Sequence, residues 1–102
     1  MRVSRQTARL TSYGTVFLRM RCMHPRCRGA VILTGPSSEF GRSDLLMRGG
    51  RTRRVEVSLS PPGAAYVRRH RRVTNVYATV LLTHPDTLST SEPLTILAPR
   101  RR

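Results

Sequence analysis

Two cysteines separated by four residues are the side chains of this sequence best suited to chemistry. Cys22 and Cys27 stand at the ends of two segments in which apolar and polar residues alternate, with Met-His-Pro-Arg between them. Residues that oppose each other on antiparallel strands have Cα atoms about 4.5–5.5 Å apart, within the range that a disulfide spans. We therefore expect the two cysteines to lie opposite each other across a hairpin loop, bonded if the protein is made in an oxidising setting.

The same cysteines could instead ligate a metal ion. Cys22, His24 and Cys27 have a spacing close to that of zinc ligands, and either His70 or His84 would supply a fourth. The chain has no second Cys/His pair, and the two further histidines lie in separate predicted turns. The disulfide is the favoured interpretation, with zinc and free thiols as alternatives, and we expect no metal or other cofactor.

The acidic residues do not indicate an active site. No two of them stand where a general acid and a general base would predictably converge; they are Glu39, Asp44, Glu56, Asp86 and Glu92. Gly49-Gly50 lacks the lysine and the following helix that a phosphate-binding loop requires. We therefore expect the protein to be non-catalytic.

Arginine dominates the charged side chains. The chain has 102 residues and a formal net charge of +14, and all 19 of its basic residues are arginine. A GC-rich genome would favour arginine codons whatever the function, whereas attraction to nucleic acid, anionic lipid or an acidic protein surface is the functional explanation. The expected polyanion-binding residues are Arg19, Arg21, Arg28, Arg51, Arg53, Arg54, Arg68, Arg69, Arg71 and Arg72. Three of them, Arg19, Arg21 and Arg28, should project from one sheet face.

Alternation of apolar and polar residues predicts the elements that position these side chains. The expected strands cover residues 15–22, 27–33, 43–48, 52–60, 73–83 and 88–97. A short helical turn is expected near residues 62–71, with Ser60 placed to cap it. Six or seven short strands at near-regular spacing favour an all-β fold, an antiparallel β-sandwich of about seven strands, over a parallel sheet.

Turn residues and the apolar positions refine this prediction. Gly49-Gly50 would permit a tight hairpin, and Pro93 indicates that the last strand lies at an edge or begins after it. The expected core is aliphatic: Val16, Leu18, Met20, Val31, Leu33, Val55, Val57, Leu59, Val80 and Leu82. We expect one domain over residues 8–98, between a flexible N-terminal arm (1–7) and a basic tail (99–102).

Targeting signals are not evident in the sequence. The first ten residues alternate arginine with polar residues, unlike a secretory signal. The longest apolar run, Ala30–Leu33, is far shorter than the ~20 residues that a membrane-spanning helix needs, so no membrane span is expected.

Parts of the chain resemble a bacterial immunoglobulin-like domain. The similar segments are Ala8–Gly14, Val16–Cys22, Cys27-Arg-Gly29, and Gly50 ahead of Val55–Leu59, then an Ala/Arg-rich helical turn and a final Leu-Thr-Ile. The specific elements are the Cys-x4-Cys-x-Gly step and the strand from Gly50 to Leu59, within a resemblance over about residues 8–98. Such domains occur, often in tandem, in large secreted or surface proteins of high-GC actinobacteria. The resemblance implies a disulfide-pinned, immunoglobulin-like sandwich that links, spaces or adheres without catalysis.

The expected function is that of a non-catalytic structural or interaction module. A virion or cell-surface assembly, in which the chain is an accessory or decoration component, is favoured over a free cytoplasmic protein. The partner would be an acidic protein surface or assembly shell. Its expected contacts are the outward apolar residues Phe17, Ile32, Tyr77 and Leu81. Nucleic-acid binding without sequence preference is the alternative, although the aromatic residues are not interleaved with the basic runs as a stacking platform would require.

Overall fold

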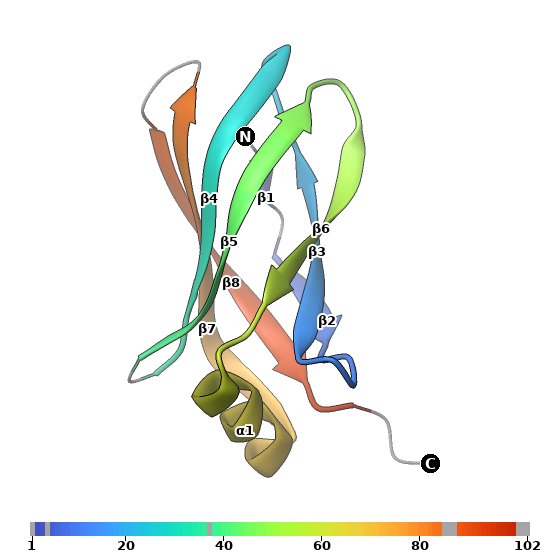
Figure 1. The fold of residues 1–102 in the computed structure, drawn as a ribbon, viewed down its shortest axis with the longest axis vertical. Helices are drawn as coiled ribbons and strands as arrows, with labels where there is room; N and C mark the ends of the chain where they lie inside the picture. Colours follow the sequence, from blue (N-terminus) through green and yellow to red (C-terminus); the bar gives the residue numbers. More distant parts are fainter. Residues whose placement is uncertain (1, 4, 37, 85–87, 100–102) are drawn as a thin grey trace.

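Two β-sheets packed face to face make up most of the fold (Figure 1). The computed structural model describes residues 2–3, 5–36, 38–84 and 88–99. Its elements are β1 (Arg2–Val3), β2 (Gln6–Arg9), β3 (Thr15–Arg21), β4 (Arg26–Thr34), β5 (Glu39–Arg48), β6 (Thr52–Ser58), α1 (Pro61–His70), β7 (Arg72–His84) and β8 (Leu88–Leu97). One sheet has the order β1-β3-β6 and the other the order β2-β8-β7-β4-β5.

This strand order is the immunoglobulin-like arrangement. If β1, β3 and β6 are strands A, B and E, then β4, β5, β7 and β8 are strands C, C′, F and G of the facing sheet. All pairs are antiparallel except β2 with β8, which run parallel. The predicted fold class, an all-β sandwich with one short helix, is confirmed.

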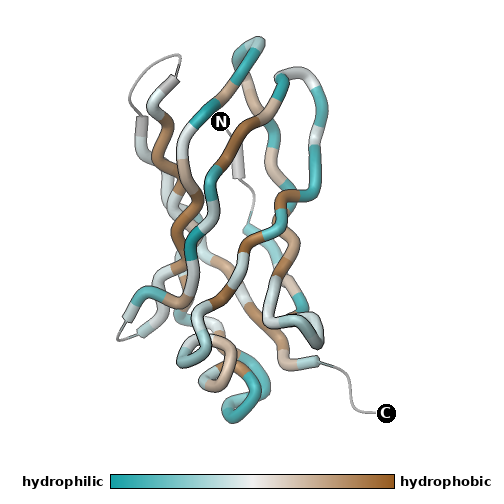
Figure 2. Tube along the Cα trace, viewed as in Figure 1, coloured by the Kyte–Doolittle hydropathy of each residue, from teal (hydrophilic) through white to brown (hydrophobic). Residues whose placement is uncertain are grey.

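An aliphatic layer between the sheets forms the core. Burial alternates along the strands as predicted, and Figure 2 shows the same alternation as apolar and polar steps along the chain. Nine of the ten predicted core residues are buried, and Val55 is partly buried against them. Phe40 extends this core, because β5 begins at Glu39 rather than at the expected residue 43.

The connections after β3 and after β5 differ from the prediction. Both were expected to be hairpins within a sheet, but β3 and β6 belong to the three-stranded sheet, whereas β4 and β5 belong to the five-stranded one. Each connection therefore carries the chain from one sheet to the other. Consecutive strands of the five-stranded sheet do pair as hairpins: β4 with β5, about the predicted turn at residues 34–38, and β7 with β8.

The N-terminal segment is part of the sandwich rather than a free arm. Arg2–Val3 pairs with β3, and Gln6–Arg9 pairs with β8. The side chain of Gln6 is buried and crosses between the sheets, where its amide nitrogen donates to the Arg19 carbonyl at 3.1 Å. The Arg19 amide donates back to the Gln6 side-chain oxygen at 2.8 Å. Residues 1 and 4 of the expected arm and 100–102 of the expected tail lie outside the described residues.

Helix α1 follows the prediction closely. The Ser60 hydroxyl oxygen accepts the Gly63 amide hydrogen at 3.2 Å, which is the expected N-cap. The helix ends at His70, and the cap residue Arg71 has φ 66° and donates its backbone amide to the Val67 carbonyl. Pro93 is opposite Tyr77 of β7, and β2 pairs with β8 only from Leu94 onward. The last strand is therefore an edge strand as far as Pro93, but it begins before that residue, at Leu88.

Replacement of Leu18 by alanine tests the aliphatic layer. Leu18 is fully buried, so Leu18→Ala should lower the free energy of unfolding by about 2–4 kcal/mol through lost burial and a residual cavity. Leu46→Ala removes the same atoms from a side chain that is 73% exposed, and should change stability by less than about 0.5 kcal/mol. Urea denaturation of both variants measures the difference, and equal losses would contradict the described sandwich.

Candidate polyanion-binding surfaces

The connections after β3 and after β5, which both cross between the sheets, meet at one end of the molecule. Cys22 and Cys27 are joined by a disulfide with Cα atoms 5.9 Å apart, and this bridge links the two sheets rather than two strands of one hairpin. The Gly49 amide donates to the Pro25 carbonyl at 3.0 Å and the Gly50 amide to the Cys22 carbonyl at 3.3 Å. We call this end, with residues 22–26 and 48–52, the loop end (Figure 1).

Both glycines of the second connection are required by its geometry. A Cβ atom at Gly49 would overlap the His24 carbonyl oxygen, so a side chain there would push the two connections apart. Gly50 has φ 92°, a conformation that is strained for residues with a side chain. The Gly49-Gly50 pair was predicted to make a tight turn, and it allows a close crossing between sheets instead.

The residues of the zinc alternative are not arranged as a metal site in this structure. Both thiols are used in the disulfide, and His70 belongs to α1, at the opposite end of the sandwich from Cys22 (Figure 1). The side chain of His84 lies outside what the structure describes. No group of three or more His, Cys, Asp or Glu side chains within the described ranges could hold a metal ion.

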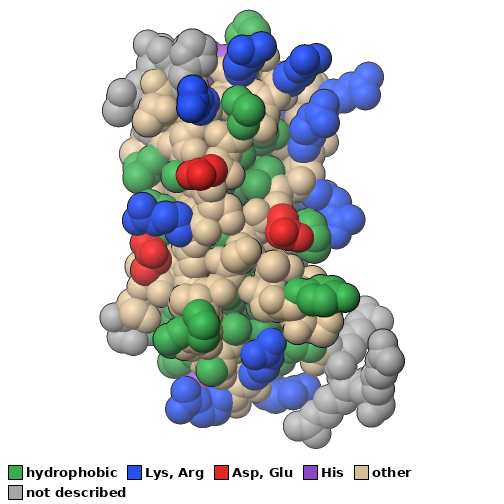
Figure 3. Space-filling model, viewed as in Figure 1, with side chains coloured by type: hydrophobic (Ala, Val, Ile, Leu, Met, Phe, Trp, Pro, Cys, Tyr) green, Lys and Arg blue, Asp and Glu red, His purple; other side chains and the backbone are tan. Residues whose placement is uncertain are grey.

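The predicted arginines do not converge on one surface. Figure 3 shows most arginines of this face toward the two ends of the molecule, with acidic side chains between them. The longest extent of the molecule is 41 Å. The arginines on the strands and connections near the loop end, which we call the loop-end group, are Arg21, Arg26, Arg28, Arg48, Arg51 and Arg53. Those at the end of α1 and the start of β7, the helix-end group, are Arg68, Arg69, Arg71 and Arg72.

The expectation that Arg19, Arg21 and Arg28 share one sheet face is wrong. Arg19 and Arg21 are exposed on β3, but Arg28 is exposed on β4, in the facing sheet. The outer faces of two packed sheets point in opposite directions. Arg54 is the arginine that joins Arg19, because the two are direct neighbours in the β3–β6 register.

Among the residues whose side chains the structure describes, like charges face each other at two places in the sheets. Arg26 is paired with Arg48 across β4 and β5, and Arg19 with Arg54 across β3 and β6. Directly opposed like charges destabilise a sheet. Among the described residues the one ion pair joins Arg42 to Glu39 at 3.0 Å, so the opposed arginines have no described carboxylate partner. Arg54 instead lies over the Phe17 ring, 4.6 Å from its centroid.

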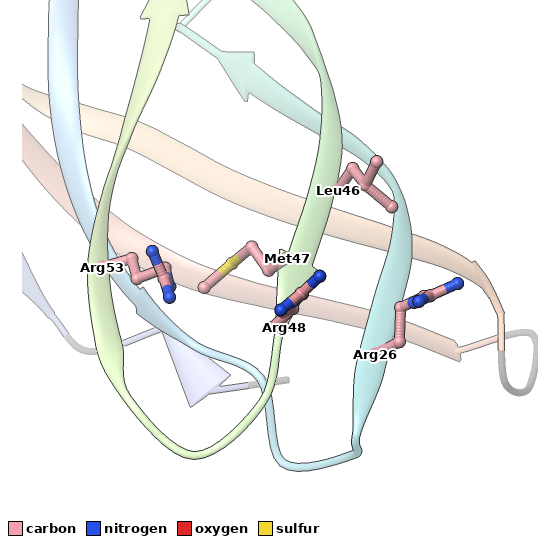
Figure 4. Close-up of a pocket in the computed structure, with 5 residues that line it drawn as sticks. All are labelled: Arg26, Leu46, Met47, Arg48 and Arg53. Atoms are coloured by element: carbon pink, nitrogen blue, oxygen red, sulfur yellow. The ribbon is translucent and has the colours of Figure 1, made fainter.

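A depression at the loop end is lined by both arginines and apolar side chains. It is lined by Arg26, Leu46, Met47, Arg48 and Arg53 (Figure 4). Met47 and Arg53 point toward each other from β5 and β6, whereas Leu46 points to the outer side of β5. Of these five residues, only Arg53 belongs to the predicted set. The turn at residues 34–38 was the available signal, because a hairpin about it places Arg26 opposite Arg48 and Arg28 opposite Leu46.

The predicted partner-binding residues are divided between the sheets. Ile32, Tyr77 and Leu81 lie on the outer face of the five-stranded sheet, whereas Phe17 lies on the other sheet beneath Arg54. Tyr77 is 53% exposed and Leu81 40%, and Ile32 is partly buried. Leu46, on the same face as Leu81 and 73% exposed, was not predicted.

Comparison with known proteins adds no family to these observations. No protein-family model matches the chain, and no curated protein sequence matches it significantly. The described helical segment has neither the length nor the apolar composition that crossing a membrane takes.

Reduction of the disulfide tests its role as the link between the sheets. The bridge closes a loop of about six residues, so its loss should lower the free energy of unfolding by about 2 kcal/mol in the chain-entropy model. Urea denaturation of the same protein with and without a phosphine reductant measures this change. A Cys22→Ala/Cys27→Ala variant is the control, because its stability should not respond to the reductant. A wild-type midpoint that does not move on complete reduction would contradict this role.

Proposed function

We propose that the protein is a non-catalytic, immunoglobulin-like interaction module whose arginines bind an acidic surface of a partner within a larger assembly. The observation that supports this proposal is the pairing of exposed arginines with each other, Arg26 with Arg48 and Arg19 with Arg54, without described carboxylates. Partner carboxylates placed between such arginines would replace a repulsion with charge-assisted hydrogen bonds. Binding of such a partner would therefore raise the free energy of unfolding of the protein.

The chemistry of the surface favours an assembly role over a catalytic one. A net charge of +14 on 102 residues increases the rate at which the protein meets any acidic surface, and this increase becomes smaller as salt is raised. The shell of a virion and the surface of a cell are large assemblies that could offer such a surface. An accessory or decoration component of one of these is the form of the proposal that also agrees with the resemblance to bacterial immunoglobulin-like domains.

Nucleic-acid binding without sequence preference is the second candidate. Its support is the outer face of the three-stranded sheet, where Arg19, Arg21 and Arg54 lie close together on β3 and β6 and could contact phosphates. The aromatic side chain of that face, Phe17, is covered by the Arg54 guanidinium and offers no free ring for base stacking. Contacts here would be to the backbone alone and would carry no sequence information.

Competition between an acidic polypeptide and DNA separates the two functions. At low salt, labelled polyglutamate and a duplex should both bind, and the affinity for the duplex should fall steeply as salt is raised. At physiological ionic strength we expect polyglutamate to displace the duplex in a fluorescence-anisotropy titration. Sequence-preferring, nanomolar binding to a duplex at that ionic strength would overturn the proposal.

Substitution of the three-stranded face provides the matching control. Arg19→Gln/Arg21→Gln/Arg54→Gln should lower the log–log salt slope for the duplex by up to about three units if these side chains contact phosphates. The same variant should keep most of its affinity for polyglutamate if the acidic partner binds at the loop end. Loss of both activities together would indicate that the binding depends on net charge alone.

A further inference from the structure

The outer face of β4 and β5 at the loop end combines charge and apolar surface in one regular array. Arg26 is opposite Arg48 and Arg28 is opposite Leu46 in the strand register. Neighbouring strands lie about 5 Å apart, and side chains two residues apart on one strand lie about 7 Å apart. Three arginines and one leucine therefore occupy the corners of a small rectangle, all four exposed to solvent. We call these four residues the arginine–leucine array.

The leucine of the array has apolar neighbours on its other side. Leu46, Ala30 and Leu81 line a second depression on the same face, together with Asp44 and Thr83. Leu46 and Leu81 are 73% and 40% exposed, so a side chain placed between them would remove apolar surface of both from water. Asp44 is an acid on this face of β5, between Leu46 and the exposed Arg42. Along β5 the face thus changes from the cationic Arg48 to the apolar Leu46 and then to the opposite charges of Asp44 and Arg42.

We propose that the arginine–leucine array is the docking site for an extended, acidic segment of a partner protein that carries an apolar side chain beside its carboxylates. The inference rests on the proposed function and names the segment that this surface fits. Carboxylates bind Arg26, Arg28 and Arg48, and the apolar side chain lies between Leu46 and Leu81.

An extended protein segment fits this surface better than a nucleic-acid strand. Alternate residues of an extended peptide project to one side about 7 Å apart, the same spacing as Arg26 and Arg28 along β4. A nucleic-acid backbone would satisfy the arginines but leave Leu46 in water, because the array contains no aromatic ring on which a base could stack. Leu46 is therefore the residue that distinguishes the two occupants.

Two labelled peptides test the proposal against the whole, disulfide-bonded protein. One is Glu-Ser-Glu-Ser-Leu-Ser-Glu-Ser-Glu, and the other has serine in place of leucine, so their charges are equal. At physiological ionic strength the leucine peptide should bind about tenfold more tightly, since burying one leucine side chain contributes at least that factor. Leu46→Ser should remove this difference. Equal affinity of the two peptides for the wild-type protein would overturn the proposal.

Charge-matched variants locate the site. Arg26→Gln/Arg28→Gln/Arg48→Gln should weaken binding of the leucine peptide at least about tenfold, because three charge-assisted contacts are lost. Arg68→Gln/Arg69→Gln/Arg72→Gln removes the same charge at the helix end and should weaken it less than about threefold, through the long-range field alone. Arg71 is left unchanged because its backbone, with φ 66°, ends the helix. Thermal denaturation checks that both variants fold, and Arg48→Gln alone replaces the loop-end variant if it does not.

The outcomes separate this inference from the proposed function. Equal weakening by the two triple variants would overturn the docking site, whereas binding of polyglutamate would still support an acidic partner. Binding of a duplex at physiological ionic strength, with neither peptide bound, would overturn both. Selective weakening at the loop end together with dependence on Leu46 supports both.

Discussion

Burial of aliphatic side chains between the two sheets decides where the arginines on the strands can lie. Every second position of β3 is apolar and buried, so the positions between them face water and are free to carry Arg19 and Arg21. The same alternation exposes Arg28 on β4 and Arg48 on β5. The core therefore sets both the stability of the sandwich and the geometry of its charged outer faces. Like-charged neighbours are tolerated because the aliphatic layer supplies the stability that they reduce.

Local patterns predicted the elements of this fold well but not their assignment to sheets. Alternation identified Leu18 and Val57 as core residues, and the position of Ser60 directly before the helical segment identified it as the cap, because these features depend on neighbours along the chain. The connection between Cys22 and Cys27 has the same length whether it turns back within a sheet or crosses to the other. That choice depends on contacts between distant strands, which a local pattern does not contain. The buried glutamine at position 6 was missed for the same reason, since its partner is on β3.

The candidate site shows a similar division. The abundance of exposed arginine could be read from composition, and the disulfide from the spacing of the cysteines. Predicting the array of Arg26, Arg28, Leu46 and Arg48 requires the register of β4 and β5. That register follows from a hairpin about the predicted turn at residues 34–38. The grouping of Arg28 with Arg19 is wrong because β3 and β4, which follow each other in sequence, belong to different sheets.

On the proposed function, the separation of the arginines into two end groups would give the molecule two valencies. With a long dimension of 41 Å and a cationic group near each end, one copy can contact two acidic bodies at once without bending. The second contact of such a particle is intramolecular, so it forms at a high effective concentration once the first is made. A protein of this shape would then act as a short cross-bridge that links acidic surfaces into a network. At an excess of protein each surface would be saturated with its own copies, and the cross-links would be lost.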